Sequence, residues 1–240
     1  LKDDFGNTFD VAVKVNVVDD VPTLTVADKI DTVTAGHTSS TVTGQITYDF
    51  GADDGADKSF TITTKDADGK DVSANYPVGS GTVTIAGAHG TLTVNAGGSY
   101  SYKANPNTEG QDSFTFKITD ADGDSTEQTI DVTVNKASGP VIGDTNGSLT
   151  VDEKGLTSTS DDSETSTWSA PKGYTITDVV TPVGTFGTAS IVDGKLSYTL
   201  SDAIGHKGEN GVTWAGADTV IVTLKDDFGN TFDVAVKVNV

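Results

Sequence analysis

The first seventeen residues of the chain, LKDDFGNTFDVAVKVNV, occur again letter for letter as residues 224–240. Self-similarity at a fixed period is the sequence signature of a repeat protein. The spacing from Leu1 to Leu224 is too long for the unit of a solenoid, so the repeating unit must consist of whole domains. We therefore expect residues 1–17 to be the closing hairpin of a preceding repeat, and the chain to act as one segment of a longer array.

The pattern of apolar residues predicts β-strands throughout the chain. Apolar and polar residues alternate in 113–118 and 130–134, and the same pattern recurs in 219–224 and 232–238. A period of two places one face of each strand in a core and the other face in water. No stretch of ten or more residues has a helical period of 3.6, while Thr and Gly are abundant. We therefore predict an all-β protein.

An internal alignment divides the chain into two related domains. Residues 112–124 align with residues 218–230, and both segments close with an Asp-rich loop that contains Gly. Two short linkers, 17–22 and 135–140, each end in Pro, which stiffens the backbone. Short strands at regular spacing favour β-sandwiches. We expect one sandwich over residues 18–136 and a second over residues 137–240.

Several stretches resemble a known family. Residues 90–102 contain Gly-Thr-Leu-Thr-Val and Ser-Tyr-Ser-Tyr, and residues 102–124 end in Asp-Ala-Asp-Gly-Asp. Both are similar to the cadherin-like and VCBS-type repeats of giant bacterial adhesins, and residues 174–240 resemble the related repeats of type I secreted, RTX-type adhesins. The resemblance implies tandem immunoglobulin-like or cadherin-like β-sandwich domains, export to the extracellular bacterial cell surface, and Ca²⁺ that rigidifies a long stalk.

The charge of the chain narrows the choice of partners. The net charge is -20 and the pI is near 4.1, and the acidic excess is almost all Asp. Nucleic acids and anionic membranes both require clustered Lys and Arg, so we expect neither as a partner. The sequence contains no run of 18 apolar residues, so we expect no membrane insertion. The absence of Cys excludes disulfides and thiol chemistry.

The loop Asp120-Ala-Asp122-Gly-Asp124 is the strongest candidate for a metal site. Gly123 permits the turn, and three carboxylates stand on a few residues. Ca²⁺ takes six to eight oxygen ligands, with carboxylates and carbonyls mixed, whereas the alternative is a solvated Asp-Gly turn. The loop lacks the final Glu and the flanking helices of an EF-hand. Asp112, in the same stretch that resembles the adhesin repeats, is included among the candidate ligands.

The equivalent loops supply further candidates. Residues 226–230 read Asp-Asp-Phe-Gly-Asn, with Phe and Asn where the first loop has Asp, and residues 3–7 are their copy. In cadherin-like arrays a domain end and the following linker share calcium, so the resemblance implies one cluster of Asp3, Asp4, Asp19 and Asp20. The corresponding candidates in the second domain are Asp226, Asp227 and Asn230.

The linker at 135–140 contains no carboxylate and carries a Lys. A matching calcium cluster at this junction is therefore in doubt, although Asp152 and Glu153 could lie near it. For this reason we expect the first linker to be stiffer than the second.

Two other acidic loops, 53–57 and 66–71, are either calcium sites or solubilising turns, and Asp66 and Asp68 are kept as candidate ligands. The His residues are dispersed, without a His or Cys partner at metal spacing, which argues against zinc. They are His37, His89 and His206. Trp168 and Trp214 fit a core or its rim better than a sugar-binding surface.

These features favour a structural function. We expect a Ca²⁺-stiffened spacer in the stalk of a bacterial adhesin or biofilm protein, with neighbouring repeats of the same polypeptide as its partners. The alternative is a lectin-like adhesive module, which would need a concave site with converging aromatic and polar groups. No Gly-x-Ser-x-Gly elbow or paired catalytic groups stand out, so we expect no enzyme.

Residues 1–17 carry an apolar stripe without a core of their own. A lone hairpin is marginal in water, and an exposed edge invites pairing. We therefore expect this segment to associate with a second copy, by strand exchange into the slot of residues 224–240 or by pairing along another sheet edge.

Overall fold

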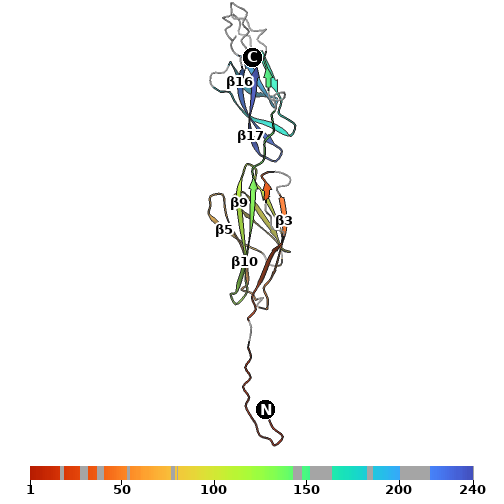
Figure 1. Cartoon of the computed structure of the whole chain (residues 1–240), viewed down its shortest axis with the longest axis vertical. Coiled ribbons are helices and arrows are strands. Elements are labelled where there is room, and N and C mark those ends of the chain that lie inside the picture. Colours follow the sequence, from red (N-terminus) through yellow and green to blue (C-terminus); the bar gives the residue numbers. More distant parts are fainter. Residues whose placement is uncertain are drawn as a thin grey trace, which may run out of the picture.

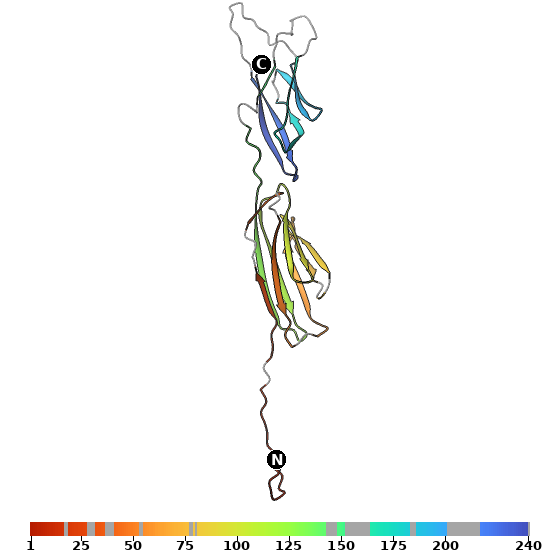
Figure 2. The same cartoon turned by 90° about the vertical axis from the view of Figure 1, so that its right-hand side faces the viewer.

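The computed structural model is an all-β rod in which two β-sandwiches are placed end to end, with an extended segment at the N-terminus (Figures 1 and 2). It describes residues 1–16, 19–27, 32–36, 41–52, 55–76, 79, 81–142, 148–151, 164–182, 186–200 and 217–239. These residues form strands and turns without a helix, so none of them belongs to a membrane-spanning helix. The predicted fold class is confirmed.

Two five-stranded sheets make up the first domain. One sheet contains, in spatial order, β1 (Thr23–Ala27), β3 (Thr41–Asp49), β8 (Ser99–Ala104), β7 (Gly90–Asn95) and β6 (Thr82–Ala86). The other contains β2 (Thr32–Thr34), β10 (Ser125–Asn135), β9 (Gly110–Thr119), β4 (Ser59–Lys65) and β5 (Asp71–Asn75). All neighbouring strands are antiparallel except β2, which runs parallel to β10. The long β9–β10 hairpin is the centre of its sheet.

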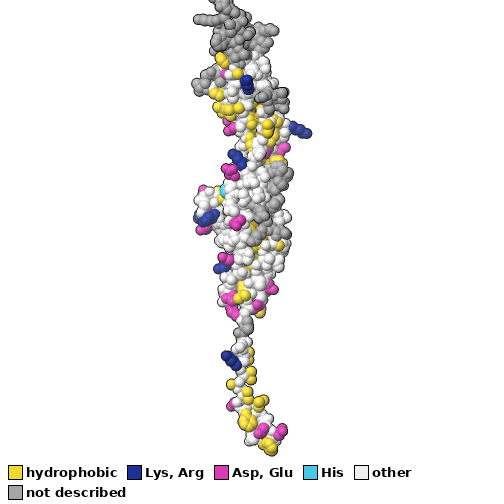
Figure 3. Space-filling model, viewed as in Figure 1, with side chains coloured by type: hydrophobic (Ala, Val, Ile, Leu, Met, Phe, Trp, Pro, Cys, Tyr) yellow, Lys and Arg dark blue, Asp and Glu magenta, His cyan; other side chains and the backbone are white. Residues whose placement is uncertain are grey.

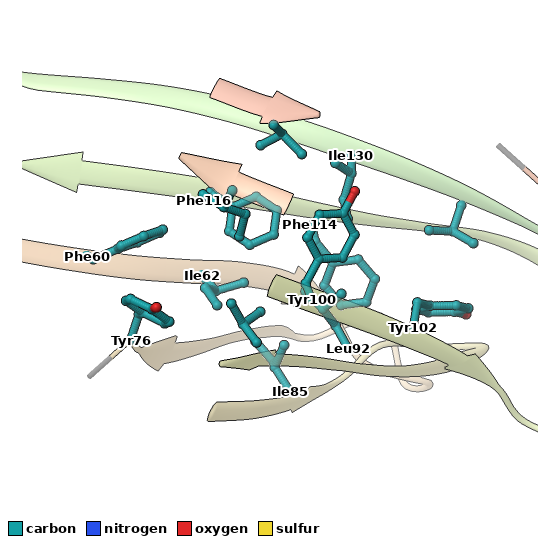
Figure 4. Close-up of a cluster of buried hydrophobic side chains, with 14 of the residues drawn as sticks. Phe60, Ile62, Tyr76, Ile85, Leu92, Tyr100, Tyr102, Phe114, Phe116 and Ile130 are labelled. Carbon is teal, nitrogen blue, oxygen red and sulfur yellow. The ribbon is translucent and has the colours of Figure 1, made fainter. Parts of the chain in front are cut away.

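The period-two pattern of the sequence determines which side chains form this core. Phe114, Phe116 and Ile118 on β9 are fully buried, and Ile130 lies opposite Phe114 on β10. Aromatic side chains from the facing sheet, Tyr100 among them, pack against these residues between the two layers (Figure 4). Burial of each such side chain contributes about 1.5–3 kcal/mol, so this layer supplies most of the stability of the domain.

The second domain is a smaller sandwich with its own core. One sheet contains β11 (Ser148–Thr150), β17 (Thr231–Asn239), β16 (Ala217–Asp226) and β13 (Tyr174–Val180), and the other contains β12 (Glu164–Trp168), β15 (Lys195–Leu200) and β14 (Gly187–Val192). Strand β11 runs parallel to β17, just as β2 runs parallel to β10. Trp168 is buried in this core. Residues named above that lie outside the described residues are His37, Asp53, Asp54, Asp152, Glu153, His206 and Trp214.

A buried Tyr–Asp pair recurs in both domains. The Tyr102 hydroxyl donates to Asp112 at 2.8 Å, and the backbone N–H of His89 also donates to that carboxylate. The Tyr198 hydroxyl likewise donates to Asp218. Burial, followed by the neighbouring carboxylate, raises the pKa of both tyrosines, which keeps each hydroxyl a donor. The pair therefore satisfies a buried carboxylate without a metal.

The N-terminal segment has no sandwich around it. Its expected hairpin is reduced to one bridge between Lys2 and Thr8 and the mutual backbone hydrogen bonds of Leu1 and Phe9, and residues 10–16 carry no strand pairing in the structure. The apolar side chains of this segment are exposed, as Figure 3 shows at the lower end of the molecule. Among them Phe5 is 92% exposed and Val13 is 78% exposed.

Candidate metal centre

The loop between β9 and β10, here called the acidic loop (residues 120–124), is built around the carboxylate of Asp120. The Asp120 N–H donates to the Asp124 carbonyl at 3.0 Å and closes the turn. One carboxylate oxygen, Oδ1, accepts from the N–H groups of Gly123 at 3.1 Å and Asp124 at 2.8 Å. Gly123 has φ 112°, a conformation that L-residues with a side chain rarely adopt. The sequence therefore fixes the turn and directs Asp120 inward.

Three carboxylates converge in this loop. Oxygens of Asp120, Asp122 and Asp124 all lie within 4.8 Å of one another. Asp120 is only 1% exposed, and its second oxygen, Oδ2, has no hydrogen-bond partner although it is buried. A buried polar atom without a partner costs about 1–3 kcal/mol, and more when the group is charged. A bound cation would remove this penalty.

The electrostatics of the loop also favour a cation. The carboxylate of Asp120, which faces Asp122, raises the pKa of Asp122, and the charge of Asp19 acts in the same direction. Ionised carboxylates are acceptors only, so they cannot satisfy one another. Carboxylate oxygens without His or Cys form a donor set suited to a hard cation such as Ca²⁺. The residues present therefore fit the metal that the resemblance implies.

The first linker reaches the same end of the domain. The Asp20 carboxylate accepts from the N–H of Ala52 at 2.8 Å, in the loop that follows β3. Gly51 has φ 73°, and a Cβ at this position would collide with the Asp20 carboxylate. Asp19 lies near enough to raise the pKa of Asp122. The linker is thus attached to the domain beside the acidic loop.

The structure does not bring Asp3 and Asp4 together with Asp19 and Asp20. The loop at 3–7 lies at the far tip of the extended segment, with residues 9–16 between it and the linker (Figures 1 and 2). The predicted cluster of these four residues is therefore not assembled here, because nothing folds the segment back onto the linker.

The loop at 226–230 satisfies its own carboxylate. Asp226 Oδ1 accepts from the N–H groups of Phe228 at 2.9 Å and Asn230 at 2.8 Å. Asp226 Oδ2 accepts from the Asn230 side-chain amide at 2.9 Å. Asn230 therefore acts as a hydrogen-bond donor toward Asp226 instead of joining it as a metal ligand. Asp227 is exposed.

The remaining candidates lie apart from the acidic loop. Asp112 sits near the opposite end of β9, where protein donors occupy its carboxylate. Asp66 accepts from the N–H groups of Asp68 and Lys70, both at 3.0 Å, and forms an ordinary turn. Within the described residues, neither Asp66 nor Asp68 belongs to a group of three metal-ligating side chains.

The junction between the two domains is a feature that the sequence reasoning missed. The Asn107 N–H donates to the Asn230 side-chain carbonyl at 3.0 Å, and the Asn230 amide donates to the Ala35 carbonyl at 3.3 Å. The Thr231 N–H donates to the Asn107 side-chain carbonyl at 2.7 Å. We call these four residues the amide joint. These bonds give the second junction contacts that do not need a carboxylate, and the relative stiffness of the two linkers stays a prediction.

Close packing accompanies the amide joint. Asn230 is 2% exposed, and a Cβ on Gly36 would lie 2.7 Å from its amide nitrogen. Asn107 has φ 58°, a left-handed conformation that Asn tolerates better than most residues. The sequence Asn105-Pro106-Asn107 is a turn signal, but no sequence rule says that such a turn faces another domain.

The comparisons with known proteins support a cadherin-like fold for part of the first domain. Residues 66–136 match the family model of the bacterial cadherin-like domain. This match covers β5 to β10, where β6 is Thr82–Ala86, and includes the acidic loop, so it supports a cadherin-like repeat in the first domain. No curated protein matches the chain.

Solved structures resemble the chain only loosely. SGBP-B of the Bacteroides ovatus mixed-linkage glucan utilization locus, in complex with a mixed-linkage heptasaccharide, is 12% identical, with a TM-score of 0.28 over 92% of this chain. The chain spans 48% of that structure. Murine CEACAM1b is 16% identical, with a TM-score of 0.31 over 90% of this chain and 98% of its own. CopC from Methylosinus trichosporium OB3b is 15% identical, with a TM-score of 0.26 over 50% of this chain and 99% of its own.

Proposed function

We propose that the chain is a structural spacer in the stalk of an extracellular bacterial adhesin. We propose also that Ca²⁺ bound at the acidic loop rigidifies the lower end of its first domain, which is the end next to the N-terminal segment. The single observation that carries the proposal is the buried, unpaired Oδ2 of Asp120 within a group of three carboxylates. The cadherin-like match over residues 66–136 supports the same reading. The proposed partners are neighbouring repeats of the same polypeptide, and no catalytic role is proposed.

The proposed role of the metal is to attach a linker to a domain end. Asp120, Asp122 and Asp124 would hold the cation, which would supply the positive charge that these side chains lack. The charge of Asp19 on the linker repels that of Asp122, so neutralising the loop would remove a repulsion that loosens the linker. Binding to the folded state alone adds roughly 2.7 kcal/mol of stability at a hundredfold excess over Kd.

Calcium titration of the full chain tests this function. Asp122→Ala removes one exposed carboxylate without altering the core, and we expect the Ca²⁺ affinity to fall at least about tenfold. Asp68→Ala is the matched control, because Asp68 holds the same position in the sequence Asp66-Ala-Asp68-Gly. We expect no change in that variant. An equal Ca²⁺ affinity in Asp122→Ala and the unmodified chain would exclude the proposed ligand set.

A hollow beside the domain junction supports a second candidate function. A cavity of about 490 Å³ is lined by aromatic residues Tyr174 and Phe228, by Asp226 and Asp227, and by backbone and small side chains from both domains. Aromatic faces beside carboxylates are a combination that suits a neutral sugar. Glycan-array binding that is lost in Phe228→Ala would favour a lectin-like module, and no binding would exclude it.

Association of the N-terminal segment with a second copy stays a prediction. The segment exposes the apolar side chains of a sequence that forms strand β17 in the second domain, where Val236 and Val238 are buried. Deletion of residues 1–17 should therefore reduce self-association in light scattering. An unchanged mass with and without the segment would contradict strand exchange.

A further inference from the structure

Four loops among the described residues share the hydrogen bonds that join their first and fifth residues. They are residues 3–7, 66–70, 120–124 and 226–230, and each has Asp at its first position and Gly at its fourth. The loop at 120–124 differs at its Gly, whose N–H donates to the Asp120 side chain, whereas in the other three loops the Gly N–H donates to the backbone carbonyl of the first residue. In all four loops, the N–H of the first residue donates to the carbonyl of the fifth at 3.0 Å. The first Asp also accepts from the N–H of the fifth residue at 2.8–3.0 Å in each loop. The fifth side chain therefore starts from the same place each time, although its chemistry differs.

The fifth residue determines whether the second carboxylate oxygen, Oδ2, of the first Asp receives a hydrogen bond from within the loop. Where it is Asn, the side-chain amide donates to that oxygen, at 2.9 Å in both Asn7–Asp3 and Asn230–Asp226. The bond forms in the exposed loop at 3–7 as well as in the docked loop at 226–230, so it belongs to the loop itself. Where the fifth residue is Asp124, it has no proton to donate, and Asp120 Oδ2 is left unpaired.

The burial of the first Asp makes this difference consequential. Asp120 is buried, whereas Asp3, Asp66 and Asp226 are each partly exposed. Water can reach the partly exposed carboxylates, but the Asp120 oxygen has only the interior of the loop. A positive or hydrogen-donating group is therefore required at this loop, and no described residue supplies it to Asp120 Oδ2.

We propose that the fifth residue of this loop selects between a bound divalent cation and an internal amide: Asp124 reserves the acidic loop for a cation, whereas Asn7 and Asn230 close their loops without one. The proposal rests on the proposed function in that it takes the acidic loop to bind Ca²⁺. It adds that the loops at 3–7 and 226–230 take no Ca²⁺ of their own.

The selection also accounts for the amide joint. The Asn230 side chain that donates to Asp226 also donates to the Ala35 carbonyl and accepts from the Asn107 N–H. One residue thus closes the loop of the second domain and attaches that loop to the first domain. The junction between the domains is consequently independent of metal, while the lower end of the first domain depends on it.

Two variants of Asp124 in the full chain test the proposal. Asp124→Asn supplies the amide, and Asp124→Ala removes the same charge without it. In EDTA we expect the first domain of Asp124→Asn to melt roughly 4 °C or more above that of Asp124→Ala, because Asp120 Oδ2 gains a donor. We expect Asp124→Asn to bind about one fewer Ca²⁺ per chain than the unmodified protein in calorimetry.

These outcomes separate the inference from the proposed function. If Asp124→Asn melts no higher than Asp124→Ala in EDTA, the amide does not replace the cation and the inference is overturned, whatever the unmodified chain binds. If the amide stabilises the loop but the unmodified chain binds no Ca²⁺, the proposed function fails, and with it the claim that Asp124 reserves a cation site.

The reverse exchange is the second test. Asn230→Asp should lower the melting temperature of the second domain in EDTA and regain part of the loss in Ca²⁺, whereas Asn230→Ala should show the loss alone. A Ca²⁺ response that is the same in both variants would overturn the selection rule at this loop.

Discussion

The two ends of the first domain face their neighbours with different chemistry. At the lower end, the carboxylates of Asp120, Asp122 and Asp124 converge, the charge of the linker residue Asp19 raises the pKa of Asp122, and one buried oxygen has no partner. At the upper end, Asn107 donates its backbone N–H to the Asn230 side-chain carbonyl and accepts from the Thr231 N–H across the domain boundary. The loops at the two ends, residues 120–124 and 226–230, share the bond from the N–H of the first residue to the carbonyl of the fifth. The comparison teaches that one turn can form either a charged or a neutral junction, according to a few side chains.

The upper junction gives the largest expected effect. Asn107→Gly keeps the left-handed backbone conformation that φ 58° requires but removes the side chain that accepts from Thr231. We expect the relative orientation of the two domains to become broadly distributed. The chain contains no Cys, so Cys can be introduced at the exposed positions Ser73 and Ser190, one in each domain, and spin-labelled. Double electron–electron resonance would then measure the distance between the two labels.

The control for this experiment is Asn105→Ala, which changes an exposed side chain on the same turn. In the unmodified chain the distance distribution should be narrow in EDTA as well as in Ca²⁺. A distribution that narrows only when Ca²⁺ is added would show that the upper junction also depends on metal, and the contrast between the two ends would be lost.

The buried Tyr–Asp pairs give a smaller effect that should be equal in both domains. Tyr102→Phe and Tyr198→Phe each remove one hydroxyl donor from a buried carboxylate, Asp112 or Asp218. We expect each change to lower the free energy of unfolding of its own domain by about 1–2 kcal/mol. Denaturant unfolding should show this loss equally with and without Ca²⁺. A Ca²⁺-dependent loss in Tyr102→Phe would return Asp112 to the list of metal ligands.

Salt gives the smallest effect. In EDTA, the repulsion among Asp19, Asp120 and Asp122 is screened as ionic strength rises. We expect added NaCl to raise the melting temperature of the first domain by roughly 1–2 °C and to leave the second domain unchanged. Equal responses in thermal scans would mean that the general charge of -20, not the acidic loop, governs the effect.

The sequence was sufficient to predict the fold, because period-two alternation is a local property. Phe114, Phe116 and Ile118 alternate with polar residues, and all three are fully buried. The acidic loop was also predictable, since three Asp and one Gly on five residues carry their own turn signal. The buried state of Asp120 was not, because its neighbours come from distant segments.

The amide joint was beyond sequence reasoning for a similar reason. Asn107 and Asn230 are separated by 123 positions, and nothing in either turn identifies the other as its partner. The sequence predicts Asn230 as a possible metal ligand because it aligns with Asp124. The alignment places Asn230 correctly in the loop. Its amide nitrogen, however, donates a hydrogen bond, whereas the carboxylate oxygens of Asp124 can only accept one.

Thermal unfolding in Ca²⁺, Mg²⁺ and EDTA, monitored both by calorimetry and by Trp fluorescence, tests most directly the claim that Ca²⁺ stabilises the first domain alone. Both tryptophans, Trp168 and Trp214, lie in the second domain, so fluorescence reports that domain alone. We predict that Ca²⁺ raises the temperature of the calorimetric transition that has no Trp signal, which is the unfolding of the first domain. Mg²⁺ should raise this temperature much less, because it gives up its waters reluctantly. The Trp transition should stay in place. Calorimetric transitions that are identical in Ca²⁺ and EDTA would contradict the account.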